Sequence, residues 1–185
     1  EYRKGNLFNA EDGVAIAHGC NCQGVMGAGI ALQFKNRYPE MFEWYKFKCQ
    51  HKDFSPGDAF VWKGKNYIGR VEDRYILNLA TQDRPGPYAR LEWIDQSLRS
   101  AIKTFGEAVP TIAMPNIGCG IGGLDWEDVE VVLETLEKSS NVKFIVYSLE
   151  GCVIVKRPWI RDRVVSARYF QRHTEQIMAF LLSGL

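Results

Sequence analysis

The sequence lacks the features that would place it in a membrane or along a polyanion. Its 185 residues carry a formal net charge of only +1, with 23 Lys and Arg against 22 Asp and Glu. This balance argues against a nucleic-acid-coating protein, an acidic activator or a disordered tail. No apolar run approaches the length of about 20 residues that spans a bilayer, and no signal-peptide pattern is present. We therefore expect a cytoplasmic address, with the nucleus as the alternative, and no membrane partner.

Cysteine is scarce and its count is odd, with Cys20, Cys22, Cys49, Cys119 and Cys152. An odd count without a secretory signal argues against a disulfide framework and favours reduced, partly buried thiols. Cys20-x-Cys22 together with Cys49-x-His51 is compatible with a zinc site, but the first spacing is tight and the second pair falls on a predicted helix. The reduced thiols are the better interpretation, so we expect no metal and no other cofactor.

What the sequence does contain is a glycine-rich stretch between a buried strand and a helix. Residues 17–31 read AHGCNCQGVMGAGIA, follow the apolar residues 14–16 and lead into a helical pattern over residues 30–38. Such a loop presents unpaired backbone N–H groups at a helix N-terminus, where the helix dipole favours an anion. The spacing G-x-x-G-x-G is not the dinucleotide fingerprint, and the chain has no G-x-x-x-x-G-K-[ST]. Because the stretch contains no Lys or Arg, backbone amides would hold the anion, for which a diphosphate is the natural candidate.

A second glycine-rich loop strengthens this interpretation. Residues 116–123 read NIGCGIGG, follow the strand-like residues 111–114 and precede a clear helical pattern. In an open α/β sheet, loops at the carboxyl ends of strands line the usual ligand crevice, so two such loops could hold a diphosphate from both sides. One glycine loop has an ordinary structural explanation, whereas two of them, with His18, Asn21 and Gln23 close by, favour a ligand site.

The chain resembles the macro domain family, an ADP-ribose-binding α/β module. The resemblance is closest to the branch that holds terminal ADP-ribose glycohydrolases, bacterial DNA ADP-ribosyl glycohydrolases and the fungal ADP-ribose-1″-phosphate phosphatase. It implies a three-layer α/β/α domain with a mixed sheet over residues 1–150. Residues 151–185 lie beyond it, and we expect them to form a basic, then apolar, helical extension. The matching segments are KGNL (4–7), IAHGCN (16–21), GVMGAGIA (24–31), PNIGCGIGGLDW (115–126) and FIVYSL (144–149).

The resemblance also implies which residues contact the ligand. Asn6 and Leu7 would meet the adenine, Tyr147 would form a wall near it, and Asn21 would contact the distal ribose. Two alternatives stay open: Asn6 as a turn asparagine and Tyr147 as a core residue. The ligand-binding residues implied are Asn6, Leu7, Asn21, Gly24, Val25, Met26, Gly27, Ala28, Gly29, Ile30, Asn116, Ile117, Gly118, Cys119, Gly120, Ile121, Gly122 and Tyr147.

The reaction depends on side chains in which this chain departs from its relatives. His18 matches a histidine of the phosphatase-like branch and is a candidate general acid or base, with a packed core histidine as the alternative. In the glycohydrolase relatives a lysine follows the residue equivalent to Thr81 and attacks the anomeric carbon, and an aspartate stands at the position of Gly122. Here the residue after Thr81 is Gln82, and a glutamine cannot form an amine adduct.

We therefore expect a hydrolase that binds ADP-ribose-1″-phosphate and removes its phosphate, with His18 as the catalytic residue. The first alternative is a hydrolase that releases ADP-ribose from modified protein or nucleic acid with water in place of lysine. The second is a non-catalytic reader of ADP-ribose.

The hydrophobic pattern predicts the elements around these loops. Asp125 is expected to cap the helix after the second glycine loop, with Asp128 in capping-box spacing. The predicted strands are residues 1–4, 59–62, 67–69, 75–79, 111–114 and 142–149, with a hairpin turn at 63–66, and the predicted helices are residues 30–38, 40–50 and 88–105.

Overall fold

The computed structural model describes residues 1–70, 74–105 and 111–148. The expected extension over residues 151–185, which includes Cys152, lies outside these ranges. The described residues form a six-stranded sheet that is mixed, as predicted, because β3 runs antiparallel to β4 while the other pairs are parallel. Across the sheet the strands are β1 (Tyr2–Lys4), β6 (Lys143–Ser148), β5 (Thr111–Met114), β2 (Ala15–Cys20), β4 (Ile76–Ala80) and β3 (Ala59–Trp62).

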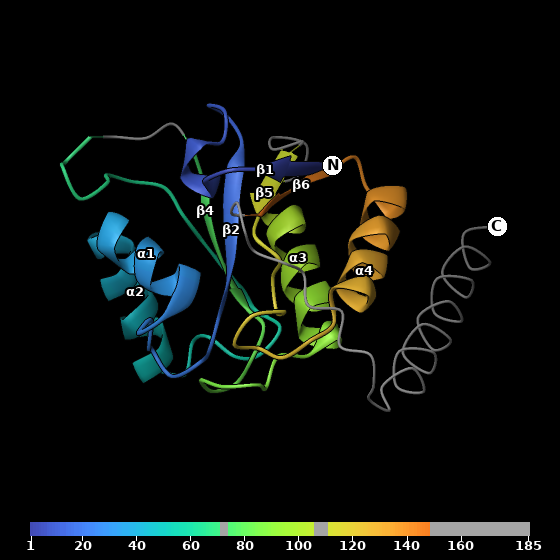
Figure 1. Ribbon diagram of the computed structural model, residues 1–185. Coiled ribbons are helices and arrows are strands. Elements are labelled where there is room, and N and C mark those ends of the chain that lie inside the picture. The colour runs from blue at the N-terminus through green and yellow to red at the C-terminus, as the bar shows by residue number, and fades with distance from the viewer. Residues whose placement is uncertain (71–73, 106–110, 149–185) are drawn as a thin grey trace. The chain divides into compact units, whose positions relative to one another are not determined.

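Helices cover both faces of this sheet, which confirms the three-layer α/β/α prediction (Figure 1). The central strands are therefore mostly apolar and buried, as in a parallel sheet covered on both faces, and every residue of β4 is buried. Within the described ranges, no helix has both the length and the apolar character needed to cross a bilayer. One face carries α1 (Gly29–Arg37) and α2 (Pro39–Gln50), the other carries α3 (Leu91–Phe105) and α4 (Trp126–Ser139), and the 3-10 helix η1 (Leu7–Asn9) follows β1.

The helix boundaries follow the sequence signals closely. Pro39 ends α1 and becomes the first residue of α2, a position where its missing N–H costs nothing. The buried side of α2 includes Met41 and Tyr45, as its helical spacing predicts. Asp125 occupies the N-cap position of α4 with an extended backbone, but its side chain makes no capping hydrogen bond, so only the position was predicted correctly.

The prediction of a strand over residues 67–69 is wrong. These residues belong to a turn in which the Asn66 Oδ1 accepts hydrogen bonds from the N–H groups of Ile68 and Arg70, at 3.2 and 3.0 Å. The partner of β3 is β4 instead, so residues 63–66 are not a hairpin turn. Tyr67 misled the prediction because an aromatic residue with a β-branched neighbour is typical of strands, yet both side chains are more than 60% exposed.

A buried asparagine joins three strands through its side chain. Asn78 on β4 is fully buried, lies level with His18 on β2 and Phe60 on β3, and contacts both. Its Oδ1 lies 2.9 Å from the His18 Nε2, and its Nδ2 donates to the Phe60 carbonyl oxygen at 3.1 Å. Since a carbonyl oxygen can only accept, His18 Nε2 carries the proton of this bond.

We expect Asn78→Leu to lower the free energy of unfolding by roughly 2–4 kcal/mol, because a buried polar group without its partner costs about 1–3 kcal/mol and two groups lose theirs. Urea denaturation measures the change. Asn141→Leu, at an exposed asparagine, is the control and should stay within about 0.5 kcal/mol of the unaltered chain. Equal stability of the two variants would contradict a structural role for the Asn78 amide.

Candidate functional site

Three loops leave the sheet at the carboxyl ends of adjacent parallel strands. We call them the first glycine loop (residues 21–28, after β2), the bridging loop (residues 81–90, after β4) and the second glycine loop (residues 115–124, after β5). Because β4, β2 and β5 are parallel neighbours, their loops emerge at one edge, in the lower part of Figure 1. This edge is where open α/β sheets bind ligands.

The bridging loop is hydrogen-bonded to both glycine loops. The Cys22 N–H donates to the Asp83 carbonyl at 3.2 Å, and the Ala89 N–H donates to the Gly122 carbonyl at 3.2 Å. The two glycine loops also approach each other directly, since a methyl group added to Gly29, just after the first loop, would lie 3.8 Å from the Ile121 Cδ1. The structure thus brings the two predicted loops together, as the sequence indicated.

Two glycines of these loops have open space beside them. Around an added methyl group, Gly120 has no atom within 4 Å and Gly27 has only a Val25 carbon at 3.9 Å, and neither glycine has a left-handed backbone. By contrast, a methyl group on Gly118 would lie 2.9 Å from Ile94 and from Leu124, so that glycine is needed for packing. Gly27 and Gly120 therefore expose main chain that a ligand can approach closely.

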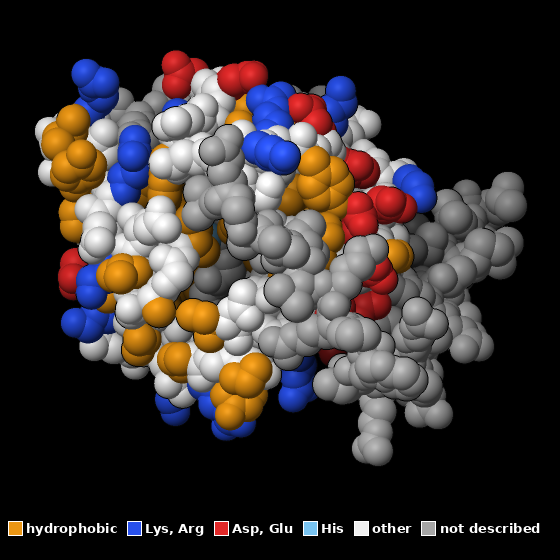
Figure 2. All heavy atoms as spheres, viewed as in Figure 1, with side chains coloured by type: hydrophobic (Ala, Val, Ile, Leu, Met, Phe, Trp, Pro, Cys, Tyr) orange, Lys and Arg blue, Asp and Glu red, His pale blue; other side chains and the backbone are white. Residues whose placement is uncertain are grey.

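The surface of the two glycine loops is uncharged and partly apolar, whereas the bridging loop exposes Arg84 and Arg90. Each loop exposes one hydrophobic side chain, Val25 (46%), Tyr88 (40%) and Ile121 (56%). In the lower part of Figure 2, where the loops lie, backbone, uncharged and hydrophobic atoms dominate, whereas Asp and Glu gather mostly toward the top and right. Since the two glycine loops contain no Lys or Arg, an anion bound here would depend on backbone N–H groups.

Asn21 shapes the first glycine loop from within. Its Nδ2 donates to the Val25 carbonyl at 2.6 Å, and its Oδ1 accepts from the Gln23 N–H at 2.9 Å and from the Tyr45 hydroxyl at 3.1 Å. The Tyr45 hydroxyl shares its one proton between this oxygen and the Asn21 carbonyl, which lies 2.8 Å away. The contact of Asn21 with a distal ribose stays a prediction, while its role in fixing the loop is visible.

Of the residues predicted to meet adenine, Asn6 and Leu7 lie at the start of η1, just after β1, and Tyr147 lies on β6, the neighbour of β1. The Asn6 Oδ1 accepts from the Phe8 N–H at 3.0 Å and caps η1, which is the role of a turn asparagine. Leu7 is buried, and Tyr147 is half-buried and packs against the hydrophobic core. The structure shows a structural role for each of these three, and their contacts with adenine stay predictions.

Asn116 lies at the start of the second glycine loop, and the hydrogen bonding of its side-chain amide is incomplete. Its Nδ2 is buried and has no hydrogen-bond partner among the described residues. Buried donors are nearly always paired, so an unpaired one needs an explanation, and an acceptor atom of a bound ligand would supply it.

The two cysteines of the glycine loops are not activated. Burial raises the pKa of the Cys22 thiol to about 12, with further increases from Cys49, Asp58 and Asp83. Burial also raises the pKa of the Cys119 thiol to about 12, with smaller contributions from nearby carboxylates. Both thiols are protonated near neutral pH and are poor nucleophiles. In the described part of the chain, no three His, Cys, Asp or Glu residues gather to hold a metal ion.

His18 lies in the core rather than among the loops. It is fully buried in the middle of β2, its ring stacks on that of Phe34 at 3.9 Å between centroids, and Nε2 is bonded to Asn78. Burial lowers the pKa of His18 to about 4, and the hydrogen bonds with Asn78 and the Gly19 backbone oppose this shift only in part. The imidazole is therefore neutral at pH 7, and its predicted catalytic role would require access that this arrangement does not provide.

Asp83 is a candidate that the sequence analysis missed. It is the one acidic residue in the three loops, it is half-buried, and its backbone carbonyl joins the bridging loop to the first glycine loop. Beside it, the Gln82 Nε2 donates to the Arg84 carbonyl at 2.8 Å, and the Arg84 guanidinium lies 4.0 Å from the centroid of the Tyr88 ring. No motif marks Asp83 in the sequence, although it directly follows the position where the relatives have their lysine.

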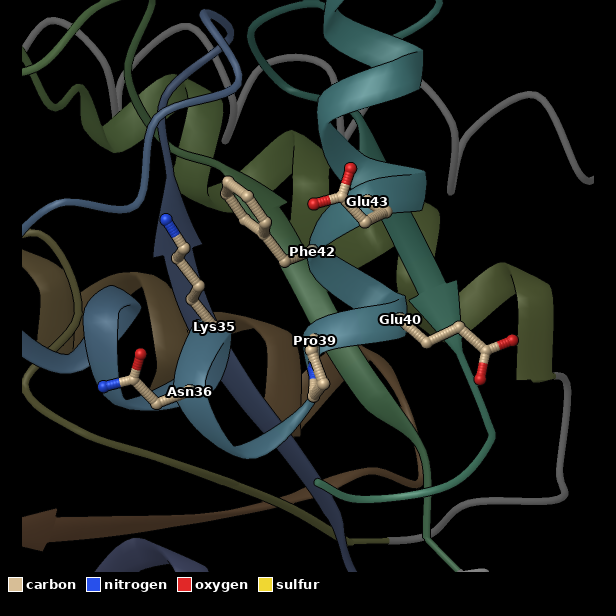
Figure 3. A pocket seen from close by; sticks show the side chains of 6 residues that line it. All are labelled: Lys35, Asn36, Pro39, Glu40, Phe42 and Glu43. Carbon is tan, nitrogen blue, oxygen red and sulfur yellow. The ribbon is translucent and has the colours of Figure 1, made fainter. Parts of the chain in front are cut away.

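A hollow of about 460 Å³ lies elsewhere, between α1 and α2 (Figure 3). Lys35 of α1 reaches toward α2, where its Nζ lies 4.3 Å from the centroid of the Phe42 ring, and Glu40 and Glu43 point outward from α2. None of the predicted site residues lines this hollow. We assign the functional site to the loops because that edge combines open main chain with buried polar atoms, which the hollow lacks.

Comparisons with known proteins agree with the resemblance. Residues 17–133 match the family model described as "Macro domain". The chain is 35% identical to a DNA ADP-ribosyl glycohydrolase of Mycobacterium tuberculosis, over 92% of this chain and 51% of that protein. It is 31% identical to an ADP-ribose 1″-phosphate phosphatase of Lodderomyces elongisporus, over 81% of this chain and 98% of that protein. The solved macrodomain of Mycobacterium tuberculosis DarG is similar with a TM-score of 0.68 and 36% identity, over 79% of this chain and 95% of that one.

The relatives differ in length as well as in the activity that their names state. The chain spans about half the length of the mycobacterial glycohydrolases that it matches, at 51% of their residues. It spans nearly the whole of the phosphatase, at 98%.

The buried His18 predicts a pH dependence of stability. Its pKa falls from 6.5 in the unfolded chain to about 4 in the folded one, so the unfolded chain binds the proton more readily below pH 6.5. The free energy of unfolding is therefore unaffected by the titration of His18 above pH 6.5 and decreases as the pH falls toward 4. At about 1.4 kcal/mol per pH unit, roughly 2 kcal/mol of it is lost between pH 6.5 and 5.

Urea denaturation at pH 7 and pH 5 measures this loss. His18→Gln should show a smaller decrease between the two pH values than the unaltered chain, because a glutamine does not titrate. His51→Gln, at an exposed histidine, should keep the full decrease. An equal decrease in all three proteins would mean that His18 does not titrate as its burial requires.

Proposed function

Since this chain belongs to the macro domain family, we propose that it binds ADP-ribose at the edge where the two glycine loops and the bridging loop meet. One observation carries the proposal: main chain is open on both glycine loops, at Gly27 and Gly120, next to the start of α1. The N-cap residue of α1 is Ala28, whose side chain cannot accept a hydrogen bond. The first N–H groups of that helix are thus available to a diphosphate, which the helix dipole also favours.

The positions of the adenine and of the distal ribose follow from this placement of the diphosphate. The adenine lies toward η1 and the end of β6, near Leu7 and Tyr147, with the Asn6 Nδ2 able to donate to a ring nitrogen. The distal ribose lies toward Asn21 and the bridging loop. Asn116 Nδ2, buried and without a partner among the described residues, donates to the diphosphate or to the distal ribose.

The chain then hydrolyses a bond at the distal ribose. Gln82 replaces the lysine nucleophile, the thiols of Cys22 and Cys119 stay protonated, and His18 is neutral and buried. The Asp83 carboxylate is the remaining group in the loops that can accept a proton from water. The distal ribose and the attacking water would be held in line by the loops, which is the positioning part of catalysis.

Two substrates fit this reaction. The phosphatase relative, which the chain spans almost completely, supports ADP-ribose-1″-phosphate as the first. The glycohydrolase relatives, which match a larger share of this chain, support ADP-ribose attached to DNA as the second. The chain would release phosphate in the first case and free ADP-ribose in the second.

Binding is tested by filling the open space beside the two loops. We expect Gly27→Val and Gly120→Val each to weaken ADP-ribose binding at least about tenfold in calorimetry, since the added side chain occupies the space of the ligand, and tenfold corresponds to about 1.4 kcal/mol. Neither side chain meets protein atoms closer than 3.9 Å at its Cβ, so thermal unfolding should be nearly unchanged and serves as the control. Unaltered affinity in both variants would place the ligand elsewhere.

Hydrolysis is tested on both substrates with Asp83→Asn and its control Asp53→Asn, an exposed aspartate far from the loops in sequence. Removing a general base lowers the rate by about 10²- to 10⁴-fold, while ADP-ribose affinity is kept. Phosphate release and ADP-ribose release from a modified oligonucleotide are followed in parallel. Tight ADP-ribose binding without release from either substrate would leave a non-catalytic reader and contradict the hydrolase proposal.

A further inference from the structure

The exposed side of α2 carries three aromatic rings in a row. Trp44 and Phe47 are 52% and 47% exposed, although their rings are large and apolar. The centroids of these two rings lie 6.0 Å apart, edge to face, and the Phe47 ring lies 3.9 Å from the His51 ring. The residues are spaced by three and four positions, so they share one side of the helix. We call this row the aromatic stripe.

Positive charge surrounds the end of the stripe. Residues 44–52 read WYKFKCQHK and contain three lysines, Lys46, Lys48 and Lys52, without an acidic residue. The Lys48 Nζ lies 5.5 Å from the centroid of the Phe60 ring, whereas Lys46 and Lys52 are exposed. The acidic residues of α2, Glu40 and Glu43, lie in its N-terminal half, which is labelled in Figure 3, and Glu43 directly precedes Trp44. The C-terminal half of α2 is thus locally basic in a chain with almost no net charge.

The helix that carries the stripe packs against the first glycine loop through another of its sides. A methyl group added to Gly24 would lie 3.4 Å from the Cα and Cγ of Lys46 and 3.5 Å from the Cys49 Cβ. The Tyr45 hydroxyl, one residue from Trp44, donates to the Asn21 carbonyl at 2.8 Å. A chain that left the loops on this side would pass Lys46 first and then reach Phe47 and Trp44.

We infer that the aromatic stripe binds single-stranded DNA, and that this strand carries the ADP-ribose held by the loops. The inference rests on the proposed function in its DNA form. Bases stack on exposed aromatic rings, and lysines contact the phosphates, which is how proteins hold single strands without reading their sequence. A protein partner fits less well, because protein interfaces are depleted in lysine and residues 46–52 contain three lysines.

Fluorescence anisotropy with an unmodified, labelled single strand of about 12 nucleotides tests the inference on the full chain. We expect Trp44→Ala and Phe47→Ala each to weaken binding about 5- to 100-fold, the usual effect of removing one stacking ring. Lys46→Gln should lower the salt dependence of the affinity by roughly one phosphate contact. Tyr67→Ala is the matched control, since it removes an equally exposed ring on the turn after β3 and should leave the affinity unchanged.

Trp44→Phe separates stacking from folding. It keeps a ring and should keep most of the affinity, while the quenching of tryptophan emission by DNA decreases. Unchanged DNA affinity in Trp44→Ala and Phe47→Ala, or no DNA binding by the unaltered chain, would overturn the inference. So would a stable dimer that Trp44→Ala converts to monomer, because the stripe would then contact a second copy. ADP-ribose calorimetry on the same proteins tests the proposed function independently, since the stripe variants should bind ADP-ribose normally.

Discussion

The burial of β2 between two layers of helices constrains the rest of this structure. Five of its six residues are buried, so any polar side chain within the strand must find its partner inside the protein. His18 does so through Asn78, and its burial keeps the imidazole neutral at pH 7. Only at the carboxyl end of the strand does the chain reach the proposed ligand site, and there it continues as glycine-rich main chain. The same burial therefore gives the domain its stability and moves its chemistry to the loops.

Much of the fold and part of the site were predictable from the sequence. Apolar runs indicated the central strands, Pro39 separated two helices, and both glycine loops were recognised and meet as expected. The turn at residues 67–69 was mistaken for a strand because its residue types suit a strand and only tertiary contacts exclude one. The partners of Asn21 and His18 were not predictable, since Tyr45 and Asn78 lie 24 and 60 residues away. No sequence motif marks Asp83, because its proposed role depends on where the folded bridging loop places it.

The domain separates two ways of holding an anionic ligand. The glycine loops carry no cationic side chain and offer N–H groups with fixed directions, which suits one diphosphate in one geometry. The C-terminal half of α2 instead offers lysines and flat rings, which suit any strand and respond to salt. The two surfaces meet at Gly24 and Lys46, so selective and unselective contacts could act on one extended ligand.

A ligand site built from main chain has a consequence for how such a domain can evolve. On the proposed function, side chains of the glycine loops that meet neither the ligand nor the core can vary, provided that Gly27 and Gly120, which leave space for the ligand, and Gly118, which is closely packed, remain glycine. In the proposed reaction, reactivity instead depends on a few side chains of the bridging loop, Gln82 and Asp83 among them. Substitutions there would then change the reaction while the main chain that binds the ligand stays the same.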